Sequence, residues 1–166
     1  MKLDDASEDE FIAAMTPLFE GAPQFLRRLA AARPFGSVDA LFEGARTIAT
    51  SMPEDEQIEL VDAHPRLGAA PGSVSAMSYV EQGYDGGRDT TSSIAVELER
   101  LNDAYEERFG FRYCIFVAGR PREALLPDMR AALDADRAAE LRRGLGAVVD
   151  IARNRYDKLA KEPAPR

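Results

Sequence analysis

The sequence predicts an all-α protein, a single-domain bundle of about seven or eight helices. In most segments of the 166-residue chain, apolar residues recur every three or four positions, which is the spacing of one helix face. One run, at 111–118, is rich in β-branched and aromatic residues, and it has no second run to pair with. With 45% hydrophobic residues, a chain of this length buries one core without disulfides. We expect the helical domain to span 8–160, with flexible ends at 1–7 and 161–166.

Helix-start signals divide the first 50 residues into three helices. Ser7 and Glu10 have the spacing of a capping box, and the apolar stripe after them predicts a helix at about 8–20. Pro23 stands where a first-turn proline belongs in a second helix. Ser37 is a suitable N-cap for a third helix.

The fourth predicted helix leads to the only histidine of the chain. Pro53 and the three acidic residues after it mark the first turn, where the helix dipole favours negative charge. The helix must end near His64, because Pro65 disfavours an α-helical conformation of the residue before it. We expect a loop at 71–73 and then a short helix at about 75–84.

A long helix and the extended segment come next. After a break at Gly86–Gly87, Ser92 or Ser93 is placed to cap a helix that ends at Gly110. Residues 111–118 then form a single extended segment between two glycines.

Two further helices are predicted toward the C-terminus. The segment 121–133 has helical spacing but contains Pro127, which implies either a kink or a helix that starts late. Apolar residues at helical spacing from about 137 to 159 predict a long last helix.

Charge and composition disfavour several classes of protein. The chain has 21 basic and 29 acidic residues, a net charge of 21 − 29 = −8, so a surface that follows nucleic-acid phosphates is not expected. No stretch approaches the roughly 20 apolar residues that a membrane helix needs. Cys114 is the only cysteine, and no basic segment leads into an apolar run at the N-terminus. We therefore expect a cytoplasmic protein.

The chain also lacks the common cofactor motifs. It has no glycine-rich phosphate loop and no Gly-x-Ser-x-Gly nucleophile elbow. One histidine and one cysteine are too few for the usual zinc sites. We expect neither a metal nor a cofactor, and any mechanism that needs an imidazole must use His64.

Two interpretations of His64 follow from its place at a helix end. The carbonyl dipoles there favour a cation, so we expect an imidazolium that is more stable than in a free histidine, whose pKa is roughly 6.5. Such a group donates a proton near neutral pH. The alternative is a capping histidine that pairs with Asp62 or with solvent.

A second candidate is a short polar stripe. Ser78, Glu81 and Gln82 share one face of the predicted helix at 75–84, which makes them a recognition surface if that face lines a pocket. The alternative is a solvated helix face. The main chain of 113–117 offers a ligand its N–H and C=O groups if these are unpaired.

Two further side chains have candidate roles. Arg155 lies beside the apolar stripe of the last helix and has the geometry to bind a carboxylate through two hydrogen bonds. The alternative is a surface arginine paired with Asp150 or Asp157. Cys114 and His64 form a nucleophile pair in principle, but an apolar setting should raise the pKa of the thiol.

Six short motifs occur in the same order as in the 2-oxo-4-hydroxy-4-carboxy-5-ureidoimidazoline (OHCU) decarboxylase family, which the chain resembles over roughly 8–160. The motifs are Arg33-Pro34-Phe35-Gly36-Ser37, Ala63-His64-Pro65-Arg66-Leu67-Gly68, Ser78-x-x-Glu81-Gln82, Leu101-Asn102-x-x-Tyr105, Arg108-Phe109-Gly110-Phe111 and Ile151-Ala152-x-x-Arg155. Arg112 stands where this family often has a proline, and Asn154 stands where it has an apolar residue.

The resemblance implies an all-α homodimer that converts OHCU to (S)-allantoin without a cofactor, as the last step of urate breakdown. It implies a functional link to hydroxyisourate hydrolase and urate oxidase. His64 matches the catalytic proton donor, Glu81 the carboxylate that places the substrate hydroxyl or fixes the imidazole, and Arg155 the guanidinium that holds anionic groups together with backbone amides. The matching substrate contacts are Pro65, Ser78, Gln82 and the main chain of Tyr113, Cys114, Ile115, Phe116 and Val117.

Two alternatives remain. The same proton-transfer site could act on a related ureido or imidazoline acid. The chain could also be a non-catalytic helical interaction module, although such a module has no need for His64, Glu81 and Arg155 together. A large apolar surface patch and the lack of a polar-lined pocket would favour the module.

Overall fold

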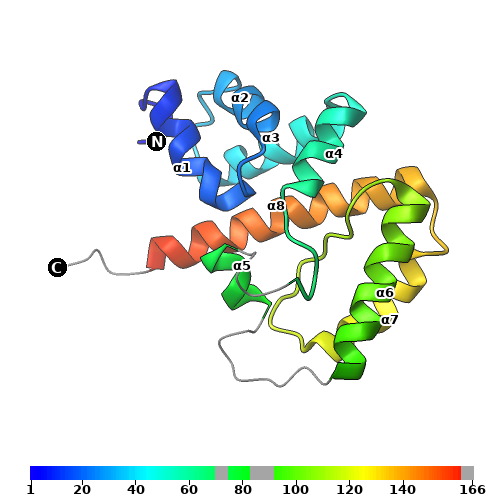
Figure 1. Ribbon diagram of the computed structural model, residues 1–166. Coiled ribbons are helices and arrows are strands. Elements are labelled where there is room, and N and C mark those ends of the chain that lie inside the picture. The colour runs from blue at the N-terminus through cyan, green and yellow to red at the C-terminus, as the bar shows by residue number, and fades with distance from the viewer. Residues whose placement is uncertain (70–74, 83–91, 162–166) are drawn as a thin grey trace.

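In the computed structural model, residues 1–69, 75–82 and 92–161 are described, and they form eight helices and no strand (Figure 1). This confirms the predicted all-α fold. The helices are α1 (Glu8–Phe19), α2 (Pro23–Ala31), α3 (Val38–Ser51), α4 (Glu54–Asp62), α5 (Ala76–Glu81), α6 (Ser92–Phe109), α7 (Arg122–Ala132) and α8 (Arg137–Lys161). None of these helices combines the length and apolarity needed to cross a membrane.

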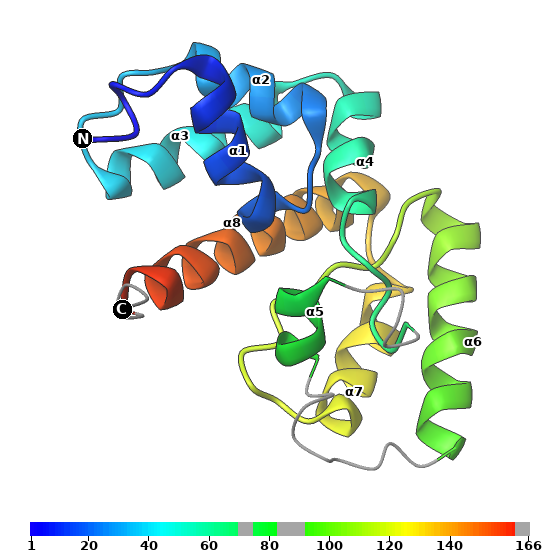
Figure 2. The same cartoon turned by 60° about the vertical axis from the view of Figure 1, so that its left-hand side comes forward.

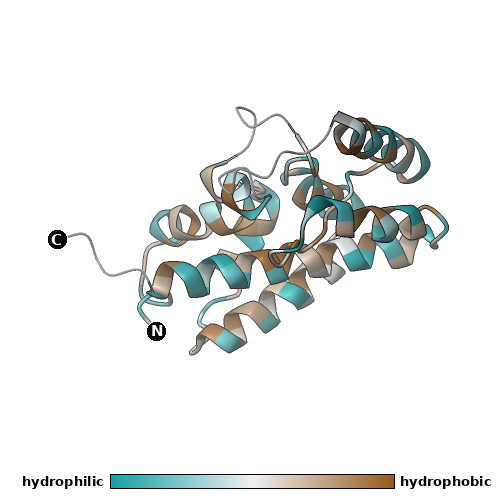
Figure 3. Ribbon diagram, turned by 90° about the horizontal axis from the view of Figure 1, so that it is seen from below, coloured by the Kyte–Doolittle hydropathy of each residue, from teal (hydrophilic) through white to brown (hydrophobic). Residues whose placement is uncertain are grey.

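The long helix α8 lies between two groups of helices. It contacts α1, α3 and α4, and its side chains Leu145, Val148 and Ala152 are fully buried. Figures 1 and 2 show α1–α4 on one side of α8 and α5–α7 on the other. Along most helices, hydrophobic and hydrophilic residues alternate in the way expected when one face is buried (Figure 3). Side chains on α8 can therefore reach a site formed between the two groups.

The predicted capping signals are present in the structure. Ser7 and Glu10 form the capping box of α1, with each side chain accepting from the backbone N–H of the other residue. Pro23 is the first residue of α2, and the Ser37 hydroxyl caps α3. Gly110 follows α6 with φ +78°, a backbone conformation that side-chain-bearing residues rarely adopt. These helix ends are determined by local chemistry.

Helix α4 ends just before His64, as the sequence predicted. It begins one residue after Pro53, which is the N-cap residue, and it ends at Asp62. The His64 N–H donates to the Val61 carbonyl at 3.2 Å, so His64 lies just beyond the helix.

Two predicted elements differ from the structure. Helix α5 is shorter than the expected 75–84, and it ends at Glu81 with Gln82 as its C-cap residue. Helix α7 begins at Arg122, so the expectation of a late start is wrong. Pro127 removes one helical hydrogen bond in this helix, but both Pro127 and Glu123, the residue whose carbonyl loses its donor, are exposed, so water can replace the bond. The expected loop at 71–73 and the break at Gly86–Gly87 lie outside the described residues.

Residues 1–7, expected as a flexible end, contact the turn at 33–36. The Asp4 carboxylate accepts hydrogen bonds from the N–H groups of Phe35 and Gly36 at 2.8 and 3.0 Å. The Arg33 guanidinium donates to two carbonyl oxygens of the N-terminal segment. These contacts join the start of the chain to the α2–α3 connection.

Among the described residues the extended segment 111–118 has no strand partner, as expected, and a network around buried Glu140 holds it against α8. The Glu140 carboxylate, 3% exposed as a residue, accepts from the hydroxyl of Tyr105 at 2.9 Å and from the guanidinium of Arg143. Arg143 also donates to the Cys114 carbonyl at 2.8 Å. Arg143 therefore links α8 to the extended segment 111–118.

Replacement of Arg143 tests this network. In Arg143→Met, Glu140 keeps a buried charge without its cation, and the free energy of unfolding should fall by about 3 kcal/mol. Chemical denaturation measures the change. Arg142→Met is the matched control, because Arg142 is exposed and makes no ion pair with the described residues. Equal, small effects of the two replacements would contradict this role of Arg143.

Candidate active site

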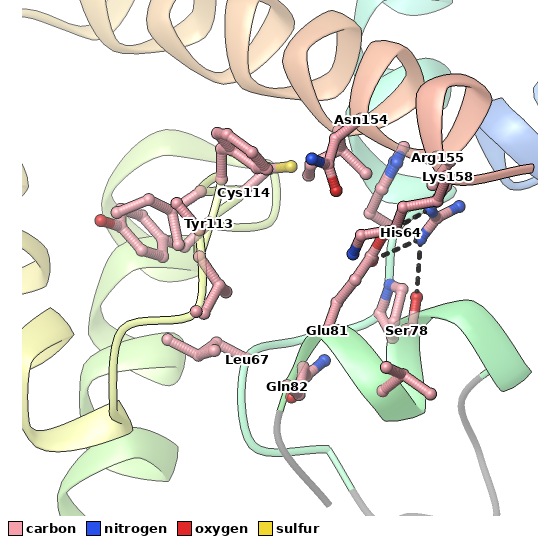
Figure 4. A pocket seen from close by; sticks show the side chains of 18 residues that line it. His64, Leu67, Ser78, Glu81, Gln82, Tyr113, Cys114, Asn154, Arg155 and Lys158 are labelled. Atoms are coloured by element: carbon pink, nitrogen blue, oxygen red, sulfur yellow. Dashed lines mark hydrogen bonds and ion pairs between the residues drawn. The ribbon is translucent and has the colours of Figure 1, made fainter. Parts of the chain in front are cut away.

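A cavity of about 430 Å³ lies beside α5, α8 and the extended segment, with the end of α4 at its wall (Figure 4). Its wall contains every residue that the sequence predicted for the site, although they come from distant parts of the chain. These residues are His64, Pro65, Ser78, Glu81, Gln82, Tyr113, Cys114, Ile115, Phe116, Val117 and Arg155. Asn154 and Lys158, which we had not predicted as site residues, line it as well.

His64 lines this cavity and carries a hydrogen-bond acceptor without a partner among the described residues. The residue is 5% exposed, and its Nδ1 lies 3.4 Å from the carbonyl oxygen of Leu60. A carbonyl oxygen only accepts hydrogen bonds, so this contact assigns the ring proton to Nδ1. The buried Nε2 then carries a lone pair, and it has no partner among the described residues.

Arg112 holds the backbone around the imidazole. Its guanidinium donates to the carbonyl oxygens of Asp62 and His64 at 2.8 and 3.2 Å, and its own N–H donates to the Asp62 carboxylate at 2.8 Å. The alternative in which His64 pairs with Asp62 is therefore wrong, because that carboxylate binds Arg112.

The expected imidazolium is also wrong. Burial, together with the positive charge of Arg155, lowers the pKa of His64 to about 4. The Glu20 carboxylate and the Leu60 carbonyl oppose this shift but do not overcome it. Removal of the ring from water outweighs the helix-end dipole on which the prediction rested. His64 is thus neutral at pH 7, and its Nε2 accepts a proton rather than donates one.

Arg155 is the most constrained side chain of the site. It is 1% exposed as a residue, and it forms a two-point pair with Glu81 through Nε and Nη2, each at 2.8 Å. Nη2 also donates to Glu20 at 2.8 Å and to the Ser78 hydroxyl at 3.1 Å. Nη1 donates to the carbonyl oxygens of Pro17 and, at 3.4 Å, Leu18. All five N–H groups of the guanidinium are directed at protein acceptors.

The alternative of a surface arginine is therefore wrong. Asp150 pairs with Arg46, and Asp157 pairs with Arg153, so neither carboxylate binds Arg155.

Glu20 is a site residue that sequence reasoning missed. It follows α1 with φ +56°, which is uncommon for a residue with a side chain. Its Oε1 accepts from the hydroxyls of Ser75 and Ser78 at 2.8 and 2.7 Å as well as from Arg155. These bonds and the charge of Arg155 lower the pKa of Glu20, although burial opposes the shift. In the sequence, Glu20 looks like an ordinary polar residue at the end of a helix.

The polar stripe of α5 faces inward, as predicted for a recognition surface. Ser78 is 3% exposed and bonds to Glu20 and Arg155, whereas Glu81 binds Arg155. Gln82 accepts from the Gly68 N–H at 2.7 Å and donates to the Arg66 carbonyl at 3.2 Å. Gln82 thereby joins α5 to the loop that follows His64.

The extended segment offers backbone groups, and its thiol is inert. Burial raises the pKa of Cys114 to about 12, so the thiol stays protonated, as the sequence predicted. A nucleophile pair of Cys114 and His64 is not supported.

The backbone N–H groups of 113–117 make no hydrogen bond within the described part of the chain. Just after them, Ala118 turns the chain with φ +51°.

The charges gathered at Arg155 are two carboxylates, Glu20 and Glu81, and its own guanidinium, which sum to −1, and Lys158 at the cavity wall brings the total to 0. In the three described stretches, no group of three or more His, Cys, Asp or Glu side chains is placed to hold a metal ion. The arrangement provides a neutral imidazole with a free lone pair beside a carboxylate that an arginine holds in place. Such a pair can accept a proton and return it to a nearby carbon.

Comparisons with known proteins agree with this arrangement. Residues 4–157 match the family model described as OHCU decarboxylase. The chain is 31% identical to the 2-oxo-4-hydroxy-4-carboxy-5-ureidoimidazoline decarboxylase of Haloferax volcanii, over 91% of this chain and 88% of that protein. It is 26% identical to a uric acid degradation bifunctional protein of a Bacillus species, over 97% of this chain and 32% of that protein.

Two solved structures share the fold. A crystal structure of OHCU decarboxylase in the presence of (S)-allantoin has a TM-score of 0.71 at 20% identity, and the match covers 95% of this chain and all of that one. A structure of (S)-allantoin synthase has a TM-score of 0.68 at 17% identity, over 95% of this chain and 52% of that one.

The protonation state of His64 is directly measurable, because the protein contains no other histidine. An NMR titration should show a single imidazole signal that stays at its neutral position down to about pH 5 and shifts toward a midpoint near 4. Glu20→Gln removes a carboxylate that raises this pKa, so the midpoint should fall further. A midpoint at 6 or above in the folded protein would contradict the assignment of a neutral histidine.

Proposed function

The chain belongs to the OHCU decarboxylase family, and we propose that it removes CO₂ from OHCU to give (S)-allantoin in urate breakdown. The observation that carries this proposal is the meeting of His64, Glu81 and Arg155 at one cavity, with a free lone pair on the imidazole. The polar lining of this cavity also removes the support for a non-catalytic interaction module.

The substrate supplies its own electron sink. Its carboxylate and hydroxyl share one ring carbon, and the neighbouring ring carbon, which bears the ureido group, belongs to the C=N bond of the imidazoline. When the bond to the carboxylate breaks, its electron pair forms a C=C bond between these two ring carbons, the π pair of the C=N bond moves to the ring nitrogen, and this nitrogen takes a proton. Addition of a proton to the ureido-bearing carbon, together with loss of the hydroxyl proton, gives the ring carbonyl of allantoin. The monoanion and one proton thus become CO₂ and allantoin, without an electron-accepting cofactor.

We assign the proton transfers to His64. A neutral imidazole cannot start as the acid, so Nε2 first accepts the proton of the substrate hydroxyl. The resulting imidazolium then donates a proton to the ureido-bearing carbon. Because His64 lies on one side of the cavity, the proton arrives on one face of the ring, and one enantiomer forms.

Glu81 is proposed to orient the substrate, and Arg155 to orient Glu81. The two-point pair leaves lone pairs on the Glu81 oxygens that can accept from a substrate hydroxyl or N–H group. Arg155 has no N–H group left for the substrate unless a bond to the protein breaks, so we propose a positioning role for it. The unpaired N–H groups of 113–117 are then the donors proposed for anionic or carbonyl oxygens of the substrate.

The proposal includes a pathway context. The match to about a third of a uric acid degradation bifunctional protein supports a functional link with the enzymes that supply OHCU, a urate oxidase and a hydroxyisourate hydrolase. We also propose that the chain forms a homodimer, as the family resemblance implies, and that it acts in the cytoplasm, as its single cysteine suggests.

Circular dichroism tests the activity. Urate is converted in situ with urate oxidase and hydroxyisourate hydrolase, and the optical signal of (S)-allantoin is followed. Protonation in free solution has no preferred face, so spontaneous decay gives no signal. The wild-type protein should give a rapid signal, and His64→Ala should reduce the rate by about 10² to 10⁴. A folded wild-type protein that behaves like the enzyme-free control would refute the proposed reaction.

A further inference from the structure

One face of α8 presents to the cavity two polar side chains that have no partner among the described residues. Asn154 and Lys158 both line the cavity, and Figure 4 shows them on the α8 side together with Arg155. Within the described residues, neither side chain makes a hydrogen bond or an ion pair. They are four residues apart and therefore neighbours on the helix surface, with Cβ atoms roughly 5 to 6 Å apart.

The charges around the cavity indicate that Lys158 binds an anionic group of the substrate. Without Lys158, the charges at the site (Glu20, Glu81 and Arg155) sum to −1, and the whole chain carries −8, so an anionic substrate would be repelled both locally and at long range. The charge of Arg155 is already counted in this sum, and its N–H groups bind protein acceptors. Lys158 is the cation at the cavity wall that lacks such partners within the described chain.

The ligand group that suits Asn154 is of a different kind. Ile151, which is 7% exposed, lies about one turn before it on α8, and Cys114, whose thiol is protonated and a weak hydrogen-bonding group, lines the same cavity. A carboxamide in such surroundings needs a donor and an acceptor from a ligand or water. A ureido group offers both side by side, so the two amide-like groups can pair through two parallel hydrogen bonds. An apolar residue at this position cannot do so.

We propose that Asn154 and Lys158 form the subsite that selects the substrate, with Asn154 binding the ureido group and Lys158 the carboxylate. In OHCU these two groups stand on adjacent ring carbons, which matches two neighbouring positions on one helix face. This inference rests on the proposed function. Because Lys158 is exposed, its ion pair is weak and screened by salt, so it should aid capture of the substrate without holding the carboxylate against loss of CO₂.

The role of Asn154 is tested with two ligands that differ only in the ureido group. Allantoin carries it, and hydantoin has the same ring without it. Asn154→Leu keeps the side-chain size and removes both polar atoms, so it should weaken allantoin binding about tenfold and leave hydantoin binding unchanged. The NMR signal of His64 reports binding of both ligands. Equal weakening of the two ligands, or of neither, would overturn the assignment.

The role of Lys158 is tested with the substrate. Lys158→Met should raise KM about tenfold with little change in kcat, and it should flatten the salt dependence of kcat/KM. Allantoin has no carboxylate, so its binding should be unchanged. Lys161→Met is the matched control, since Lys161 lies one turn further along α8 and does not line the cavity. Identical kinetics for Lys158→Met and Lys161→Met would overturn the proposal.

Different results would refute the proposed function and the proposed subsite. A wild-type protein that forms no (S)-allantoin and binds neither ligand would refute the proposed function and, with it, the subsite. A wild-type protein that turns over OHCU, with variants of Asn154 and Lys158 that behave like it, would refute the subsite alone.

Discussion

The buried guanidinium of Arg155 is the interaction on which the site depends. A buried cation is stable only when surrounding acceptors compensate its charge and satisfy its N–H groups. Here those acceptors come from two other helices: Glu20 and two carbonyl oxygens from the end of α1, and Ser78 and Glu81 from α5. Helix α5 has only six residues, which is too short to be stable alone. Its pairing with α8 therefore gives Glu81 a fixed place at the cavity.

Burial, together with the same charge, determines the chemistry of His64. An imidazole at a helix end would ordinarily be stabilised as a cation, but this ring is removed from water and lies near Arg155. Its pKa falls, Nδ1 keeps its proton, and Nε2 is left as an acceptor. A decarboxylation of OHCU needs such a group, because the substrate hydroxyl must lose a proton while the ureido-bearing carbon gains one. Arg155 thus influences both His64 and Glu81 without a free N–H group of its own.

The features that the sequence predicted are those determined by local chemistry. The capping box at Ser7, the proline at position 23 and the cap at Ser37 involve residues a few positions apart, and the structure confirms all three. Contacts between distant segments were not predictable in this way. Glu20 and Arg155 are separated by 135 positions, and no local pattern joins them. The protonation state of His64 depends on that same long-range assembly, which is why the helix-end argument gave the wrong sign.

A double-mutant cycle on Glu81 and Arg155 tests the central claim most directly. The measured quantity is kcat/KM for OHCU decarboxylation in Glu81→Gln, Arg155→Lys and the double variant, each confirmed as folded by far-UV circular dichroism. If Arg155 acts by holding Glu81, the double variant should be no slower than Glu81→Gln, because the second change removes a contact that is already lost. Rate losses that multiply in the double variant would show that Arg155 acts on the substrate independently, and they would contradict this account.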